Sequence, residues 1–305
     1  SGRFATGYYH NNTALGYQSL RGAPGGGGGS ENTAIGNYTL YENASGSYNT
    51  TTGVSALRLN TTGANNTATG YEALYSNTTA VDNTAHGYKA LHNNTIGTKN
   101  TASGAYAGQN TTGYENTATG YKASYSSTSG NGNTAHGSYA LYSNTTWGNT
   151  GFGFNALYGN TTGTYNTATG YQSLYWNTTG TYNAVTGYQA LYAVTSGSKN
   201  IGIGYHAGNA ITTGSNNTII GDLPGSTALA DTVLIAAGTT ERLKVNSTGL
   251  YINGTLMSGG GGGGASAIND LTDGYYNATS KSLGLGSLTL GVEDASNLRY
   301  NVGVG

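Results

Sequence analysis

The sequence predicts an all-β protein, a repetitive β-roll or β-solenoid with coils of about 17 residues, and three observations lead to this fold class. Glycine and tyrosine are abundant, with 53 and 27 copies among 305 residues, while only 8% of residues are charged; ordinary soluble domains are about 25% charged. A block reading Asn-Thr-Ala-x-Gly-Tyr-x-Ala-Leu-Tyr-x-Asn-Thr-Thr-Gly recurs along the chain. Asn, Thr and Gly are poor helix formers and the period is too short for a two-helix repeat, so helical solenoids are excluded.

The first glycine of the block marks the period. Successive copies of this glycine are 17 residues apart, except for two intervals of 16. Two partial copies lie around Gly7 and Gly16, and the run from Gly25 to Gly29 interrupts them and is typical of a loop. The full copies place the glycine at Gly36, Gly53, Gly70, Gly87, Gly104, Gly120, Gly137, Gly153, Gly170, Gly187, Gly204 and Gly221.

Each block predicts one coil with two short extended pieces, residues 67–69 and residues 72–75, which Gly70 separates and Asn77-Thr78-Thr79 closes. In the first piece the middle residue is small in most copies, as Ala68 is, whereas the next residue varies freely. Side chains alternate along a strand, so the middle residue is expected to point inward and the next one outward. The glycine that follows predicts a positive φ or a close approach of backbone, and so a corner of the coil.

An asparagine opens the block in every full copy. Stacked coils would place these side chains in a structural ladder, in which amides hydrogen-bond across the strand spacing of about 4.8 Å. The predicted ladder consists of Asn32, Asn49, Asn66, Asn83, Asn100, Asn116, Asn133, Asn149, Asn166, Asn183, Asn200 and Asn217.

A recurring leucine suggests association. One coil alone offers two alanines and one leucine, which cannot offset the ordering entropy of the whole coil. We therefore expect a homotrimer, intertwined or side by side, in preference to a lone solenoid, with the leucines facing a shared axis. These are Leu20, Leu40, Leu57, Leu74, Leu91, Leu141, Leu157, Leu174 and Leu191.

Aromatic residues form columns in the repeat. Rings at the positions of Tyr71 and Tyr75 recur in most coils, and we interpret them mainly as ladders that stabilise adjacent strands. Trp147 and Trp176, the only tryptophans, are the better candidates for surface contact, for example with sugars. Outward threonines also permit ice binding, although His, Ser and Phe interrupt the row.

The chain divides into five segments. Residues 1–29 hold partial repeats with a Gly-rich insertion, and residues 30–222 form the shaft of 17-residue repeats. Alternating apolar residues around Ser247-Thr248-Gly249 and Asn253-Gly254 predict a short β-strand module over residues 223–258. Residues 259–264 read as a glycine hinge, and residues 265–305 as a linker module and the start of a further repeat block at Ser282. The pattern is cut at both ends, so we expect a longer polypeptide.

The block resembles known repeats. Asn32-Thr33-Ala34-Ile35-Gly36 is similar to the rungs in the heads of trimeric autotransporter adhesins, whose repeats are shorter. The longer form, Gly-Tyr-x-Ala-Leu-Tyr-x-Asn-Thr-Thr-Gly, looks still more like repeats in phage tail fibres, and Glu241-Arg242-Leu243 with the residues after it resembles a strand module that follows such repeats. Both resemblances imply adhesion and not catalysis.

Several function classes are excluded or disfavoured by the residues. A net charge of −1 without basic runs does not fit a nucleic-acid partner, and no apolar stretch is long enough to insert into a membrane. The absence of cysteine excludes thiolate metal sites, and the scattered histidines and carboxylates predict no metal, no cofactor and no enzyme. We expect an extracellular adhesive fibre that binds a host or other surface, through glycans for example, in a virion appendage (a phage tail fibre). The alternatives are a bacterial cell-surface trimeric adhesin or filament, and a glycan- or ice-binding solenoid.

Overall fold

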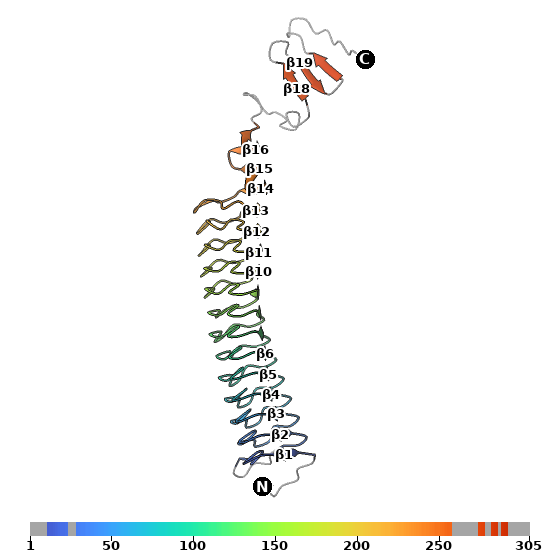
Figure 1. Ribbon diagram of the computed structural model, residues 1–305, viewed down its shortest axis with the longest axis vertical. Coiled ribbons are helices and arrows are strands. Elements are labelled where there is room, and N and C mark those ends of the chain that lie inside the picture. Colours follow the sequence, from blue (N-terminus) through green and yellow to red (C-terminus); the bar gives the residue numbers. More distant parts are fainter. Residues whose placement is uncertain (1–10, 24–28, 258–273, 278–281, 286–287, 292–305) are drawn as a thin grey trace. The chain divides into compact units, whose positions relative to one another are not determined.

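A computed structural model describes residues 11–23 and 29–257, and the strands β18 (Gly274–Asn277), β19 (Ser282–Leu285) and β20 (Leu288–Gly291) (Figure 1). The chain forms two units, Ser1–Thr240 and Glu241–Gly305. The predicted hinge at 259–264, residues 1–10 and most of residues 265–305 lie outside the described residues.

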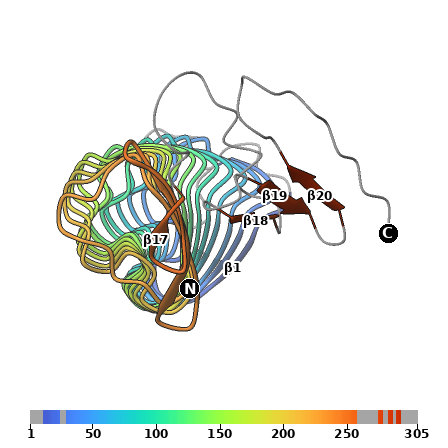
Figure 2. The same ribbon diagram turned by 90° about the horizontal axis from the view of Figure 1, so that it is seen from above.

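The first unit is a β-solenoid of about 13 turns, as the repeat predicts (Figure 1). Every turn contributes one strand of three residues, and neighbouring strands pair in parallel with equivalent residues side by side, for example Ala68 with Ala85. Seen from above, successive coils lie over one another (Figure 2). The strands are β1 (Thr13–Leu15), β2 (Thr33–Ile35), β3 (Thr50–Thr52), β4 (Thr67–Thr69), β5 (Thr84–His86), β6 (Thr101–Ser103), β7 (Thr117–Thr119), β8 (Thr134–His136), β9 (Thr150–Phe152), β10 (Thr167–Thr169), β11 (Ala184–Thr186), β12 (Ile201–Ile203) and β13 (Thr218–Ile220).

The predicted alternation and corner are confirmed. In β4 the side chain of Ala68 is fully buried while that of Thr69 is exposed. The glycine after each strand has a positive φ, +126° at Gly36, and a Cβ there would lie 1.7 Å from the carbonyl oxygen of Gly53 in the next coil. Glycine is therefore required both by backbone conformation and by the close approach of coils.

The prediction of a second extended piece in each coil is wrong. Residues 71–76 form turns, and two of them, Glu72 and Leu74, have left-handed φ angles of 52° and 51°. In the next coil the N–H of Asn94 donates to the carbonyl of Leu91 at 3.1 Å, which closes a turn of the chain. A straight strand here would carry the chain away from the axis, whereas these turns return it within one coil.

The leucines do not face a shared axis, so that prediction is wrong as well. Each coil closes on itself and directs its leucine into its own interior, against the strand alanines. The single chain therefore buries its apolar column without a second copy, and a homotrimer does not follow from it. Leu20 is half-buried, while the side chains at 0–1% exposure are Leu40, Leu57, Leu74, Leu91, Leu141, Leu157, Leu174 and Leu191.

The repeat changes after Gly221. Strand β14 (Val233–Ala237) still joins the sheet in parallel to β13, with Leu234 beside Ile219. Strands β15 (Thr240–Asn246), β16 (Gly249–Ile252) and β17 (Thr255–Leu256) then form an antiparallel meander. Strands β18, β19 and β20 form a separate antiparallel sheet, so Ser282–Leu285 is its central strand and does not begin a parallel coil.

Candidate functional site

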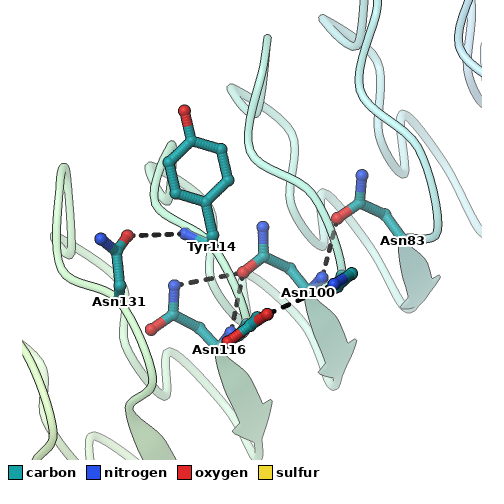
Figure 3. A network of polar contacts seen from close by, with 7 residues as sticks. Asn83, Asn100, Tyr114, Asn116 and Asn131 are labelled. Carbon is teal, nitrogen blue, oxygen red and sulfur yellow. Dashed lines mark hydrogen bonds and ion pairs between the residues drawn. The ribbon is translucent and has the colours of Figure 1, made fainter.

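The asparagines that open each block form a continuous buried ladder, of which Figure 3 shows Asn83, Asn100 and Asn116. Asn116 illustrates it, because both its backbone N–H, at 3.0 Å, and its Nδ2, at 3.1 Å, donate to Oδ1 of Asn100. Nδ2 also donates to the carbonyl of Gly130 at 2.8 Å. All twelve predicted members are 0–3% exposed. Each Oδ1 thus satisfies a backbone N–H of the next coil, a group that would otherwise be buried without a partner.

Sequence reasoning missed a second buried ladder, formed by Asn43, Asn60, Asn77, Asn94, Asn144, Asn160 and Asn177. Nδ2 of Asn77 donates to Oδ1 of Asn60 at 2.9 Å and to the carbonyl of Ala80 at 3.1 Å. The recurring Asn-Thr-Thr of the repeat was the signal that could have revealed it. In the equivalent position other coils carry Thr111, Ser127, Val194 and Ile211.

The two ladders tolerate change differently for a physical reason. In the first ladder Oδ1 accepts a backbone N–H, as Asn66 Oδ1 accepts that of Asn83 at 3.0 Å, and all twelve blocks keep Asn. In the second ladder the bonds run mainly between side chains and to a local carbonyl. An apolar residue such as Val194 therefore leaves fewer buried polar groups without a hydrogen-bond partner than it would in the first ladder. Asn177 is the last asparagine of this ladder before Val194, and its Oδ1 has no hydrogen-bond partner.

The tyrosine columns are stacks in which rings cover one another. In one column Phe154, Tyr171, Tyr188 and Tyr205 lie with ring centroids 5.1–5.3 Å apart and planes within 14°. In the other, centroids are 5.0–5.3 Å apart along Tyr125, Tyr142, Tyr158, Tyr175 and Tyr192. Stacking turns the ring faces toward neighbouring coils, so mainly the edges and hydroxyls face outward.

A third column runs between the two stacks. Tyr139 in this column contacts Phe154 of one stack and Tyr142 of the other, with centroid distances of 6.3 and 5.8 Å. Later coils fill the same column with polar groups: Nε2 of Gln189 donates to Oε1 of Gln172 at 2.7 Å, and His206 Nε2 lies 3.0 Å from Oε1 of Gln189. We call Asn155, Gln172, Gln189 and His206 the amide lane.

Earlier coils hold charges on this face. The guanidinium of Arg58 lies 5.0–5.8 Å from the ring centroids of three tyrosines, and Lys122 Nζ lies 5.3–5.9 Å from four. Glu72 Oε2 lies 3.4 Å from Lys89 Nζ and 3.3 Å from His92 Nε2. Burial lowers the pKa of His92 and Lys89 acts in the same sense, while the carboxylate of Glu72 opposes them without prevailing. His92 is therefore held neutral here at ordinary pH.

The two tryptophans occupy different positions of the coil. Trp147 lies two residues before Asn149, the asparagine that precedes β9, and is 57% exposed. Trp176 follows Tyr175 at the edge of one stack, with its ring at 84° to that of Tyr175, and is 48% exposed. Only Trp176 belongs to the same face as the amide lane.

Other candidate sites are few. Among the described residues no group of three or more His, Cys, Asp or Glu could hold a metal ion. His86 and His136 lie in β5 and β8, and the ring of His136 stacks on Phe152 at 4.5 Å. The described part of the chain also contains no helix with the length and apolar character to cross a membrane.

Comparisons with known proteins do not assign the chain to a family. No family model matches it, and neither the curated proteins nor the solved structures gave a match.

Proposed function

We propose that the chain is a structural segment of an extracellular attachment fibre, and that its parent is a virion appendage such as a phage tail fibre. The supporting observation is the uninterrupted first ladder, in which every buried Asn side chain serves the next coil. The buried amides of this ladder thus hold coils together, and among the residues that the structure describes no nucleophile and base are set apart from the repeat. The proposed role is mechanical and adhesive, and not catalytic.

The geometry suits a spacer. Each coil adds one strand spacing of about 4.8 Å, so the strands β1 to β13 would extend over roughly 60 Å. A spacer of this kind would hold a receptor-binding region away from its anchor. Immunogold labelling with an antibody raised against the chain tests this location: label on virion appendages supports it, label on bacterial surfaces favours the adhesin alternative, and label only inside cells overturns an extracellular fibre.

We propose in addition that three chains associate. Resemblance to fibre repeats supports this, and the column of leucines no longer does. The outward strand face, where Leu15, Ile35, Ile201, Ile203 and Ile220 are exposed apolar side chains, offers an alternative contact surface. Light scattering of the full chain is the test. A mass near 93 kDa, three times the 31.0 kDa of one chain, supports a trimer, and a stable monomer overturns it.

An ice-binding solenoid is a second candidate. Its support is the outward threonine pairs of β3, β4, β7 and β10, which lie in register on one sheet face. His86, His136 and Phe152 interrupt that array, so we rank ice binding below the fibre. Thermal hysteresis of the purified chain would place ice binding first, and its absence would remove this candidate.

A further inference from the structure

The amide lane and its flanking rings form a neutral, regularly spaced surface over four coils. None of Asn155, Gln172, Gln189 and His206 is an acid or a permanently charged base, in contrast to the earlier coils with Arg58, Glu72, Lys89 and Lys122. The residues on either side of the lane are aromatic in each of these coils, except that Asn209 takes one flanking position in the last coil. Such a surface favours a neutral ligand that is rich in hydroxyl groups.

Hydrogen-bonding capacity on this face is left open to solvent. Within the described chain no hydrogen bond is made by the hydroxyls of Tyr158, Tyr171, Tyr175, Tyr188 and Tyr192, and the Gln172 amide nitrogen also has none. Burial raises the pKa of Tyr175, so its hydroxyl stays protonated and can donate. The coils of Gln172 and Gln189 therefore present phenol hydroxyls on both sides of the amide, while the coils of Asn155 and His206 present a phenol hydroxyl on one side only.

The spacing along the solenoid selects the ligand geometry. Flanking rings repeat every 5.0–5.3 Å, once per coil. Extended β-1,4-linked glycans advance by nearly the same distance per sugar, and they carry hydroxyl groups along both edges of the ribbon. A glycan lying parallel to the solenoid axis would thus meet one set of groups per sugar. Coiled α-1,4-linked glucans cannot keep this register.

Trp176 adds a different kind of contact at the edge of the same face. It stands at 84° to the stacked Tyr175, so its ring plane does not follow the stack, and about half of it is exposed. An indole face that neighbouring coils do not cover can pack against the apolar C–H face of a sugar ring, as aromatic platforms do.

We propose that residues 153–209 form a binding site for a neutral, extended β-1,4-linked glycan, with the amide lane along its centre and Trp176 at its edge. The site holds one sugar per coil, and so about four sugars. This goes beyond the fibre role and does not rest on it, because a single chain carries the whole lane.

Calorimetry with cello-oligosaccharides and chito-oligosaccharides on the full chain tests the site. We expect one of the two hexasaccharides to bind at least about tenfold more tightly than its disaccharide, because each coil adds contacts, and α-1,4-linked maltohexaose not to bind. In a Trp147→Phe variant, the fluorescence of Trp176 should change on binding. Failure of both hexasaccharides to bind would overturn the proposal.

Two variants distinguish a loss of glycan binding from a loss of folding. Gln172→Ala with Gln189→Ala should weaken binding about tenfold or more, through lost hydrogen bonds at half-exposed positions. The chain should stay folded, with the unfolding midpoint lowered only by the loss of the two bonds within the lane. Tyr182→Ala is the matched control, since it removes an exposed ring stacked on Tyr165 outside the lane, and it should bind like the wild type. Equal loss in both variants, or no loss in the double variant, refutes the lane. The light-scattering mass is independent of either result.

Discussion

Replacing an asparagine of the first ladder should cost more stability than replacing one of the second. Asn66→Val removes four hydrogen bonds: two donated by its Nδ2, and the two that its Oδ1 accepts from the N–H and Nδ2 of Asn83. The carbonyl of Ala80 still accepts a hydrogen bond from Asn77, and Asn83 Nδ2 still donates to the carbonyl of Gly97. The backbone N–H of Asn83 alone is left without a partner.

The magnitude follows from these groups. An orphaned buried N–H costs about 1–3 kcal/mol, and each of the other three bonds contributes about 1 kcal/mol, so Asn66→Val should lower the free energy of unfolding by roughly 4–6 kcal/mol. Asn77→Val removes two good bonds and one long one of 3.5 Å to Asn94, and orphans only the side-chain oxygen of Asn60. By the same count its expected cost is roughly 2–4 kcal/mol, about 2 kcal/mol less than that of Asn66→Val.

Urea unfolding followed by circular dichroism compares the two variants, with Thr69→Ala as an exposed control expected to change stability by less than about 0.5 kcal/mol. Amide hydrogen exchange supplies a local readout, because the N–H of Asn83 should lose protection in Asn66→Val and keep it in Asn77→Val. Equal costs in the two ladders, or an Asn83 amide that stays protected, would refute the distinction between backbone-serving and side-chain ladders.

Two further predictions concern the corner glycines and pH. Gly36→Ala places a Cβ 1.7 Å from the oxygen of Gly53, so we expect the free energy of unfolding in urea to fall by more than about 3 kcal/mol. The control Gly132→Ala, with φ +62° and no atom within 4 Å of its Cβ, should cost only about 1–2 kcal/mol. Similar losses in the two variants would contradict a steric clash at Gly36. Because the folded pKa of His92 lies below its unfolded value of about 6.5, the unfolded state binds more protons between these two values, and stability should fall as pH drops through that window. His92→Gln should flatten this part of the pH–stability curve, and an unchanged slope would show that another group is responsible.

Much of the coil could be predicted because equivalent residues repeat. The small inward residue at Ala68, the outward residue at Thr69 and the glycine corner all follow from period-two alternation and the steric limits of a positive φ. The column of asparagines was also visible, since identical side chains in stacked coils necessarily lie above one another. In a stack of coils, residues at equivalent positions of the repeat lie side by side in neighbouring coils.

Side-chain direction in the turns could not be predicted in this way. A positive φ at Leu74 costs about 1–2 kcal/mol locally, so sequence reasoning favoured an extended segment and an outward leucine. In the structure the N–H of Leu74 donates to the carbonyl of Ala90 in the next coil at 2.9 Å, and the side chain is buried inside the coil. Contacts between coils offset the local strain, and no single block contains them.

The sequence by itself determined that this chain is a β-solenoid, what its period is, and which residues form columns. Only the tertiary structure decided that the leucines of the turns point into their own coil, that a second asparagine ladder exists, and that Gln172 and Gln189 lie between two stacks of rings. The physical reason is that periodicity establishes which residues are equivalent from coil to coil. The path of the chain around one coil depends on left-handed turns that are stable only once neighbouring coils hydrogen-bond to them.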